Sequence, residues 1–197
     1  MTDQSYTLFD TAIGRCAIAW TGVGIAALQL PEASEAATAA RLRRRHPGFA
    51  KAEPPPAVAR AIAAITALLE GKKSDLSGIA LDMAPVPDFN RQVYEIARRI
   101  PPGRTRTYGE IATELGDRAL AREVGQALGQ NPFAIIVPCH RVLGANGKVG
   151  GFSANGGVET KIRMLTIEGA ELGSKPTLFD SLPAMAPPSR SHGRRVR

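Results

Sequence analysis

The chain has 197 residues, of which 44% are hydrophobic, and a formal net charge of +7. This length is sufficient for one medium-sized domain or two small ones with hydrophobic cores. No apolar run approaches the ~20 residues of a membrane-spanning helix, and Met1–Tyr6 is polar and acidic, so the sequence predicts a soluble protein without an export signal and excludes an integral membrane protein.

Much of the net positive charge comes from the C-terminal end of the chain. Four arginines occur there in a Pro/Ser-rich stretch: Arg190, Arg194, Arg195 and Arg197. Removing these four from the 25 basic residues, against 18 acidic ones, leaves a balance of +3. The body of the protein is therefore mildly basic, which permits a polyanionic partner without requiring one.

Cys16 and Cys139 are the only cysteines. Two cysteines are too few for a disulfide framework, which indicates a reducing compartment in which thiols stay free. Together with three scattered histidines they give no zinc-ligand spacing, so the sequence predicts no metal site.

Three short strands are predicted at the start of the chain. Residues 6–10, 15–21 and 25–29 are rich in apolar and β-branched side chains and are separated by glycine-containing turns. The chain therefore opens with three short predicted strands.

Two alanine-rich helical patterns follow, over residues 34–45 and 56–70, and residues 76–83 suggest a returning strand. Strands followed by helices predict a small α+β domain over residues 1–84. No set of carboxylates in this part of the chain indicates catalysis.

The proline-rich segment 84–87 is the predicted linker, and helical spacing resumes after it. Four apolar residues share one face of that helix: Phe89, Val93, Ile96 and Ala97. The sequence Pro101-Pro102 ends it.

Two short helices are predicted next. Thr107, with Glu110 three residues on, forms a capping box that opens a helix over 108–115, and Gly116 ends that helix. A second helix is predicted over 119–128. Two short helices across a glycine-containing turn are typical of a helix-turn-helix, although a helical hairpin in any core shows the same pattern.

Residues 131–142 combine a short apolar run with a cysteine. Ala134–Val137 has the length and β-branching of a buried strand, which Pro138 interrupts. Cys139 is therefore predicted at a strand end, with the imidazole of His140 on the next residue. Because free cysteines are often small core hydrophobes, the pattern alone leaves a structural and a nucleophilic Cys139 open.

The remainder of the chain is predicted to hold a hairpin, a loop and a helix. Asn146-Gly147 between apolar runs predicts a hairpin over 143–149, and a glycine-rich loop follows. The last helix ends near Glu168 at Gly169. Residues 173–197 have the composition of a disordered basic tail.

The sequence Pro138-Cys139-His140-Arg141, with Asn131-Pro132 upstream, resembles the active-site signature of the methylated-DNA–protein-cysteine methyltransferases, the O6-alkylguanine-DNA alkyltransferases. The likeness is strong over residues 89–169 and loose over the first 85. It implies an α+β protein with an N-terminal ribonuclease-H-like α/β domain over 1–84. A winged helix-turn-helix domain over 85–172 would bind DNA and carry the active site.

The resemblance implies DNA repair by a single-turnover transferase without a cofactor. A methyl or larger alkyl group would move irreversibly from O6-methylguanine, or from O4-methylthymine, to the protein's own cysteine. Cys139 would be the acceptor, with His140 acting as its base through a water molecule and Glu168 orienting the imidazole. Asn131 would tie the helix-turn-helix to the active-site segment.

The resemblance also assigns the residues that meet the substrate. The Tyr108 hydroxyl would donate to guanine N3, and Ser153 and Phe152 would lie in a loop that closes over the flipped base. Backbone carbonyls of Val142 and Cys139 would accept from the guanine amine.

Double-stranded DNA is the partner that the resemblance implies, bound through its minor groove with the alkylated base flipped out. Arg122 would fill the place of that base. Three further residues would lie at the DNA: Ala121, Gly125 and Arg141. Glu123 and Gln126 are larger or more acidic than is typical of this helix. We expect a monomer without a membrane partner, located in the cytoplasm and at the nucleoid when bound to DNA.

Three other functions compete with this interpretation. An alkylated-DNA damage sensor would flip the base without repairing it, but such proteins lack the cysteine. A cysteine hydrolase could use Cys139, His140 and Glu168, yet it needs an oxyanion hole for which the sequence shows no sign. A transcriptional regulator of this family would carry an additional zinc-binding domain.

Overall fold

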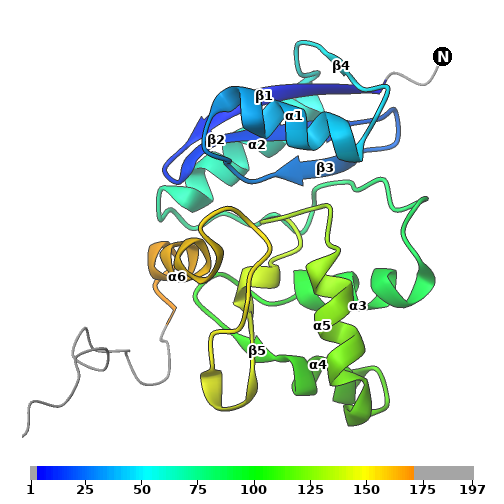
Figure 1. The fold of residues 1–197 in the computed structure, drawn as a ribbon, viewed down its shortest axis with the longest axis vertical. Helices are drawn as coiled ribbons and strands as arrows, with labels where there is room; N and C mark the ends of the chain where they lie inside the picture. The colour runs from blue at the N-terminus through cyan, green and yellow to red at the C-terminus, as the bar shows by residue number, and fades with distance from the viewer. Residues whose placement is uncertain (1–3, 171–197) are drawn as a thin grey trace, which may run out of the picture.

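The computed structural model describes residues 4–170, which form a sheet with two helices above a group of helices (Figure 1). β1 (Ser5–Thr11), β2 (Gly14–Trp20) and β3 (Ile25–Gln29) are antiparallel neighbours. The short β4 (Ala50–Lys51) pairs in parallel with β1, which gives the order β3-β2-β1-β4. The three predicted strands are confirmed, whereas β4 is too short to leave a pattern.

Both faces of β2 are buried, because α1 (Glu35–Arg45) and α2 (Pro56–Leu69) cover opposite sides of the sheet. Ala17 and Ala19 pack with Leu42 of α1, and Cys16 and Ile18 belong to the cluster on the α2 side. Successive strand residues point to opposite faces, so one strand supplies both clusters. The small alanines let α1 approach closely.

The second half of the chain is mainly helical. Its elements are α3 (Asp88–Arg98), β5 (Arg106–Thr107), α4 (Tyr108–Glu114), the 3-10 turn η1 (Arg118–Leu120), α5 (Ala121–Gly129), the 3-10 turn η2 (Cys139–Arg141), β6 (Val142–Leu143), the 3-10 turn η3 (Ala145–Gly147) and α6 (Gly157–Ile167). The structure thus confirms the mixed α+β class. The predicted tail over 173–197 lies outside the described residues.

α4 begins at the predicted capping box. The Thr107 hydroxyl accepts from the Glu110 amide at 3.2 Å, and the Glu110 carboxylate accepts from the Thr107 amide at 2.5 Å. These two bonds satisfy backbone donors that a helix N-terminus otherwise leaves unpaired. η1 then leads directly into α5, close to the predicted start of the second helix.

One backbone contact joins the two halves at the edge of the sheet. The Leu28 amide of β3 donates to the Pro132 carbonyl at 2.7 Å, and Leu28 forms a parallel bridge with Phe133. The main hydrophobic cluster continues from α2 through this contact to α3, α5 and α6. The segment before Cys139 is therefore attached to the N-terminal sheet.

The predicted strand over Ala134–Val137 is wrong. The segment is a tight turn in which Ile135 has φ of 70°, the Ile136 amide donates to Ala134 at 2.9 Å and the Val137 amide donates to Phe133 at 2.8 Å. Three of its four side chains are nonetheless buried. A buried turn and a buried strand need the same apolar residues, so composition could not separate them.

The predicted strand over 76–83 and the predicted hairpin over 143–149 are also absent from the described residues. In the segment 76–83 only Leu81 makes a bridge, to Ile25. Asn146 and Gly147 do form a turn with positive φ, but β6 pairs in parallel with β5 instead of returning as a hairpin. Short strands depend on partners that are distant in the sequence.

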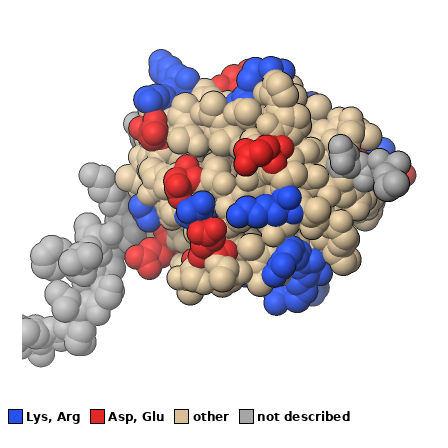
Figure 2. Space-filling model, turned by 90° about the horizontal axis from the view of Figure 1, so that it is seen from above, with Lys and Arg blue, Asp and Glu red and all other residues tan. Residues whose placement is uncertain are grey.

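Within residues 4–170, no helix combines the length and the apolar character that are needed to cross a membrane. Figure 2 shows basic and acidic side chains interspersed over the face seen from above, which agrees with the modest charge of the body.

We predict that Thr107→Ala lowers the free energy of unfolding by about 1 kcal/mol, because the α4 cap loses its side-chain acceptor. Urea denaturation measures this change. Thr113→Ala is the control, since Thr113 is exposed in the same helix and its hydroxyl bonds only to the Gly109 carbonyl. An equal loss in both variants would contradict the assigned cap.

Candidate active site

Cys139 is the first residue of η2 and is partly buried. It lies in a small cavity of about 30 Å³ that both halves of the chain line. The lining includes Leu28 of the sheet, Arg41 and Arg45 of α1, Asn131, and Phe152 and Ser153 of the loop before α6. A cavity of this size has room for water but not for a purine. The flipped base that the resemblance implies could enter only if part of the lining moved.

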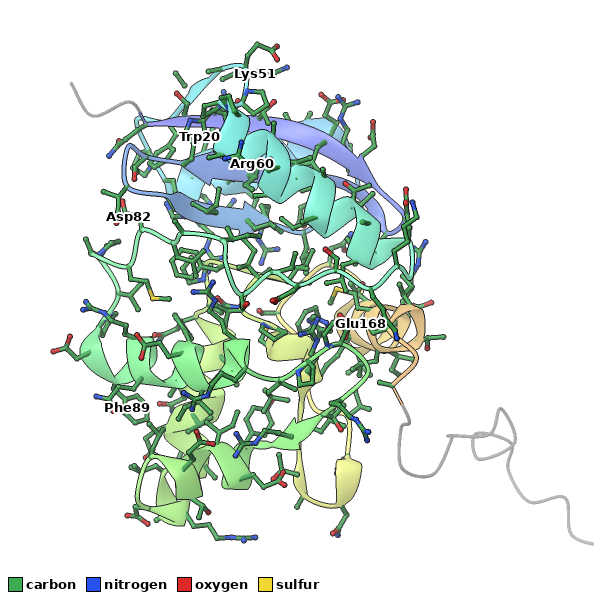
Figure 3. All side chains as sticks on the ribbon, turned by 180° about the vertical axis from the view of Figure 1, so that it is seen from behind. Trp20, Lys51, Arg60, Asp82, Phe89 and Glu168 are labelled. Carbon is green, nitrogen blue, oxygen red and sulfur yellow. The ribbon has the colours of Figure 1, made fainter. Side chains whose placement is uncertain are left out.

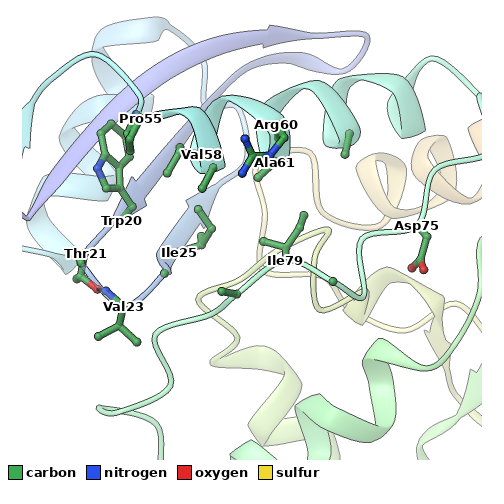
Figure 4. A pocket seen from close by; sticks show the side chains of 16 residues that line it. Trp20, Thr21, Val23, Ile25, Pro55, Val58, Arg60, Ala61, Asp75 and Ile79 are labelled. Carbon is green, nitrogen blue, oxygen red and sulfur yellow. Dashed lines mark hydrogen bonds between the residues drawn. The ribbon is translucent and has the colours of Figure 1, made fainter.

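The larger cavities of the described residues are not lined by Cys139. One of about 590 Å³ lies between the β2–β3 hairpin, α2 and residues 75–80, with Trp20, Arg60 and Asp75 around it (Figure 4). Another of about 770 Å³ follows residues 73–77 and 98–102. Neither is lined by a cysteine, whereas the small cavity is lined by Cys139.

The imidazole next to Cys139 is held by a buried carboxylate. His140 Nε2 lies 2.9 Å from Glu168 Oε1, and the two side chains are 1% and 0% exposed. Figure 3 shows Glu168 at the end of α6, where the two halves of the molecule meet. The 3-10 backbone of η2 places the imidazole here, not in the extended direction that a strand end would give.

The charge of Glu168 determines which nitrogen of His140 carries the proton. Burial alone would raise the pKa of Glu168, but hydrogen bonds from His140 and Arg141 and their charges bring it down to about 2. The carboxylate therefore accepts from Nε2–H, and Nδ1 is an acceptor. Within the described residues Nδ1 is buried without a hydrogen-bond partner. Burial lowers the pKa of His140 while Glu168 raises it, and the net change is downward, so the neutral base dominates near pH 7.

Arg141 is the second partner of the same carboxylate. Its Nε and Nη2 donate to the two Glu168 oxygens at 2.8 Å each, and Nη1 donates to the Ile100 carbonyl at 2.6 Å. The side chain is buried, so its guanidinium is not available for the DNA contact that the sequence suggested. We assign Arg141 a structural role.

Asn131 ties the end of α5 to the turn before Cys139. Its Nδ2 donates to the Val137 carbonyl at 2.9 Å, and its Oδ1 accepts from the Phe133 amide at 2.9 Å. Burial raises the pKa of the Cys139 thiol, while a hydrogen bond from Asn131 and the charge of Lys161 act in the opposite direction. Asn131 therefore shapes the turn and acts against the rise in the pKa of Cys139.

Lys161 is a site residue that the sequence analysis missed. Its ammonium group is buried, donates to the Val142 carbonyl at 2.7 Å and lies 5.9 Å from the centre of the Tyr108 ring. This is the same Val142 carbonyl that was expected to face the guanine amine. Lys161 lies three residues before Met164 and four before Leu165, both buried on α6, so the helical spacing placed it near the apolar face but did not show that its ammonium group points inward.

The other predicted residues divide into two groups. Tyr108 is half-buried beside Gly125, and burial followed by the proximity of Cys139 raises the pKa of its hydroxyl. Phe152 and Ser153 line the Cys139 cavity. In α5, Arg122 is exposed on the first turn, together with Glu123 and Gln126, while Ala121 and Gly125 are partly covered. These α5 residues do not line the Cys139 cavity.

The described residues contain no group of three or more His, Cys, Asp or Glu side chains placed to hold a metal ion. A thiol, a neutral imidazole with one acceptor nitrogen and an orienting carboxylate are the components of an activated cysteine nucleophile.

Comparison with known proteins shows where the similarity lies. Residues 88–170 match the family described as 6-O-methylguanine DNA methyltransferase, DNA binding domain. A methylated-DNA–protein-cysteine methyltransferase of Mycolicibacterium paratuberculosis is 42% identical over 128 residues, which are 65% of this chain and 75% of the relative.

Solved structures extend the similarity to the N-terminal half. The O6-methylguanine methyltransferase of Mycobacterium tuberculosis superposes with a TM-score of 0.68 at 35% identity, over 90% of this chain and 99% of the other. A structure of Mycobacterium tuberculosis OGT in complex with DNA gives a TM-score of 0.68 at 34% identity, over 84% and 92% of the two chains.

We predict that Glu168→Gln lowers the free energy of unfolding at pH 7 by about 3–5 kcal/mol, because Arg141 then remains buried without its charge partner. In the wild type the folded pKa of about 2 lies below the unfolded value of ~4.3. The stability that Glu168 contributes is therefore complete above that unfolded value and is lost as the pH falls toward 2.

Urea denaturation at pH 7, 4 and 2.5 measures both effects. The difference in the free energy of unfolding between wild type and Glu168→Gln should become smaller as the pH falls. Glu159→Gln is the matched control, since Glu159 is exposed in the same helix. A gap that stays constant with pH would show that the carboxylate charge does not stabilise the fold.

Proposed function

This chain belongs to the methylated-DNA–protein-cysteine methyltransferase family, and we propose that it repairs DNA by direct reversal of alkylation. The observation that carries this proposal is the arrangement at η2, where Glu168 holds Nε2 of His140, the residue after Cys139, and Nδ1 remains an acceptor without a hydrogen-bond partner. The alkyl group of O6-methylguanine moves to Cys139, and each molecule reacts once without a cofactor.

The reaction is a displacement at carbon. His140 takes the thiol proton through a water molecule, and the resulting imidazolium is stabilised by Glu168. The sulfur of Cys139 forms a bond to the methyl carbon as the bond from that carbon to guanine O6 breaks. The electron pair leaves with the purine, and a proton from the Tyr108 hydroxyl to N3 makes the leaving group neutral. Tyr108 is left as a phenolate, whose negative charge balances the His140 imidazolium. The ammonium group of Lys161 is placed to offset negative charge on Tyr108 and on the Cys139 sulfur.

The substrate is alkylated double-stranded DNA. The complex of the mycobacterial relative with DNA supports this partner. We propose that α4 and α5 act as a winged helix-turn-helix, with the exposed face of α5 in the minor groove and the damaged base flipped toward Cys139. Arg122 then occupies the vacated place in the duplex. Phe152 and Ser153 close over the base.

The proposed organisation follows the domain boundaries expected from the sequence. Residues 1–84 form a ribonuclease-H-like domain, which the sheet with helices on both faces supports. Residues 85–172 form the catalytic domain, and 173–197 a basic tail. The protein acts as a monomer in the cytoplasm, at the nucleoid when bound to DNA.

The competing functions are less well supported. A damage sensor has no use for the thiol and its base, and both are in place. A cysteine hydrolase needs several turnovers and a built oxyanion hole. The curated relatives are named as methyltransferases.

We predict that incubation with DNA containing O6-methylguanine adds one methyl group per chain, located on Cys139. Cys16 should remain unmodified, because it is fully buried and burial raises the pKa of its thiol to about 12. Intact-mass measurement and peptide mapping test this, with Cys139→Ser as the inactive control. Several turnovers per molecule, or a methyl group on Cys16, would contradict the proposal.

We predict that Arg122→Ala slows repair of duplex DNA by at least about tenfold and scarcely changes the reaction with free O6-benzylguanine, because only the duplex base must be unstacked. A mismatched lesion should partly rescue the variant. Single-turnover rates measure the effect.

Arg118→Ala is the control for lost positive charge, since Arg118 is an exposed arginine in the turn before α5. We expect Arg118→Ala to weaken binding to all DNA alike. The slope of the logarithm of the binding constant against the logarithm of the salt concentration should fall by about one unit. If Arg122→Ala behaved in the same way, Arg122 would be a phosphate contact and not the residue that replaces the base.

A further inference from the structure

One side chain of α1 reaches the loop over the Cys139 cavity. The Nη2 of Arg41 donates to the Ser153 carbonyl at 3.0 Å, across 112 positions of the sequence. Its Nη1 forms an ion pair with Glu32 Oε1 at 2.7 Å. A single guanidinium therefore connects the N-terminal half of the chain to the loop that carries Phe152 and Ser153.

The anchor of Arg41 is built into the N-terminal half. Glu32 Oε1 also accepts from Gln29 Nε2 at 3.2 Å, and Gln29 is buried at the end of β3. The Glu32 amide donates to the Thr38 hydroxyl of α1 at 2.9 Å. Two ends of one planar fork are thus fixed in different halves of the molecule, a geometry that arginine supports and lysine does not.

The loop itself is held by few other bonds. Gly150 and Gly151 begin it, and Gly156 and Gly157 end it. The Asn155 and Ala154 carbonyls accept from the start of α6. Within the part of the chain that the structure describes, the Arg41 bond is the one hydrogen bond that reaches residues 149–153 from outside that segment. A glycine-rich segment with so few bonds has low local stability.

The cavity under this loop shows why its position matters. The cavity measures about 30 Å³, and Arg41, Cys139, Phe152 and Ser153 all line it. A base enters only when the loop opens, and it is held for reaction only when the loop closes again. The position of the loop is therefore part of the catalytic geometry.

We propose that Arg41 is a positioning residue that latches the loop 150–156 in its closed position over the Cys139 cavity. This inference rests on the proposed function, since it deepens the assignment of that site. It gives the N-terminal half a role in the reaction, whereas the sequence indicated none. Glu32 neutralises the Arg41 charge, and the side chain is only 29% exposed, which favours a latch over a contact with DNA phosphate.

The test compares Arg41→Ala and Arg41→Lys with wild type. Hydrogen exchange of a peptide that covers residues 149–156 reports loop opening without any substrate. Single-turnover methyl or benzyl transfer, at saturating DNA and at saturating free O6-benzylguanine, reports the reaction. Arg43→Ala is the matched control, because Arg43 is exposed on the same helix and its loss removes one positive charge without touching the loop.

We expect exchange of the loop to rise about tenfold in both Arg41 variants, since a hydrogen bond to a charged group is lost. The saturating rate should fall about tenfold with DNA and with the free base alike. Arg41→Lys should remain slow despite its charge. Arg43→Ala should keep wild-type rates and loop protection. If Arg41→Ala fails to fold, Glu32→Gln replaces it in the test. This variant keeps the cation but weakens its anchor, so the increase in loop exchange and the loss of rate should be smaller than tenfold.

Unchanged loop exchange in the Arg41 variants would overturn the latch. So would a rate loss confined to DNA with a reduced salt dependence, because that result identifies a phosphate contact. Failure of the proposed function is a separate result: the wild type would take up no alkyl group, while the loop exchange would still respond to Arg41.

Discussion

The buried carboxylate of Glu168 is the constraint on which the rest of the site depends. A carboxylate without access to water must be paired with a hydrogen-bond donor or a cation. Here the two oxygens of Glu168 accept hydrogen bonds from both His140 and Arg141. Because these two residues are adjacent in η2, the requirement fixes the 3-10 turn and attaches it to the end of α6. Cys139, the residue before them, is placed by the same turn. The orientation of the imidazole and the position of the thiol therefore have a common cause.

The cavity beside that turn is assembled from distant parts of the chain. The edge of β3 holds Pro132, Asn131 holds the turn before the thiol, and Lys161 approaches from α6. Each contact holds a residue within seven positions of Cys139 in the chain. The N-terminal half is consequently part of the site's construction, even though it contributes no group to the displacement itself. The positive φ of Ile135 is an unfavourable conformation for a β-branched residue. The contacts from the surrounding structure keep the turn in this conformation.

Burial gives the thiol two opposing properties. It raises the pKa of Cys139, which protects the thiol from casual reaction, and it makes the nearby charge of Lys161 more effective because the local dielectric is low. Reactivity then requires the base, the cation and the substrate to be present together. A protein that is consumed by its reaction benefits from this arrangement, because an exposed and permanently ionised thiol would be lost to other electrophiles.

The sequence by itself determined the elements whose stabilising contacts are local. The Thr107 capping box, the three strands and the helices up to α6 follow from caps and periodicities that a few neighbouring residues establish, and the Cys139-His140 signature was visible with them. Only the tertiary structure decided the buried turn at Ile135, the Glu168 pairing of Arg141, the inward ammonium of Lys161 and the reach of Arg41 to Ser153. The three side-chain contacts join residues far apart in the chain, and the turn follows a segment that is held by distant Leu28. A buried apolar run or an isolated charge has the same local pattern whichever partner it meets.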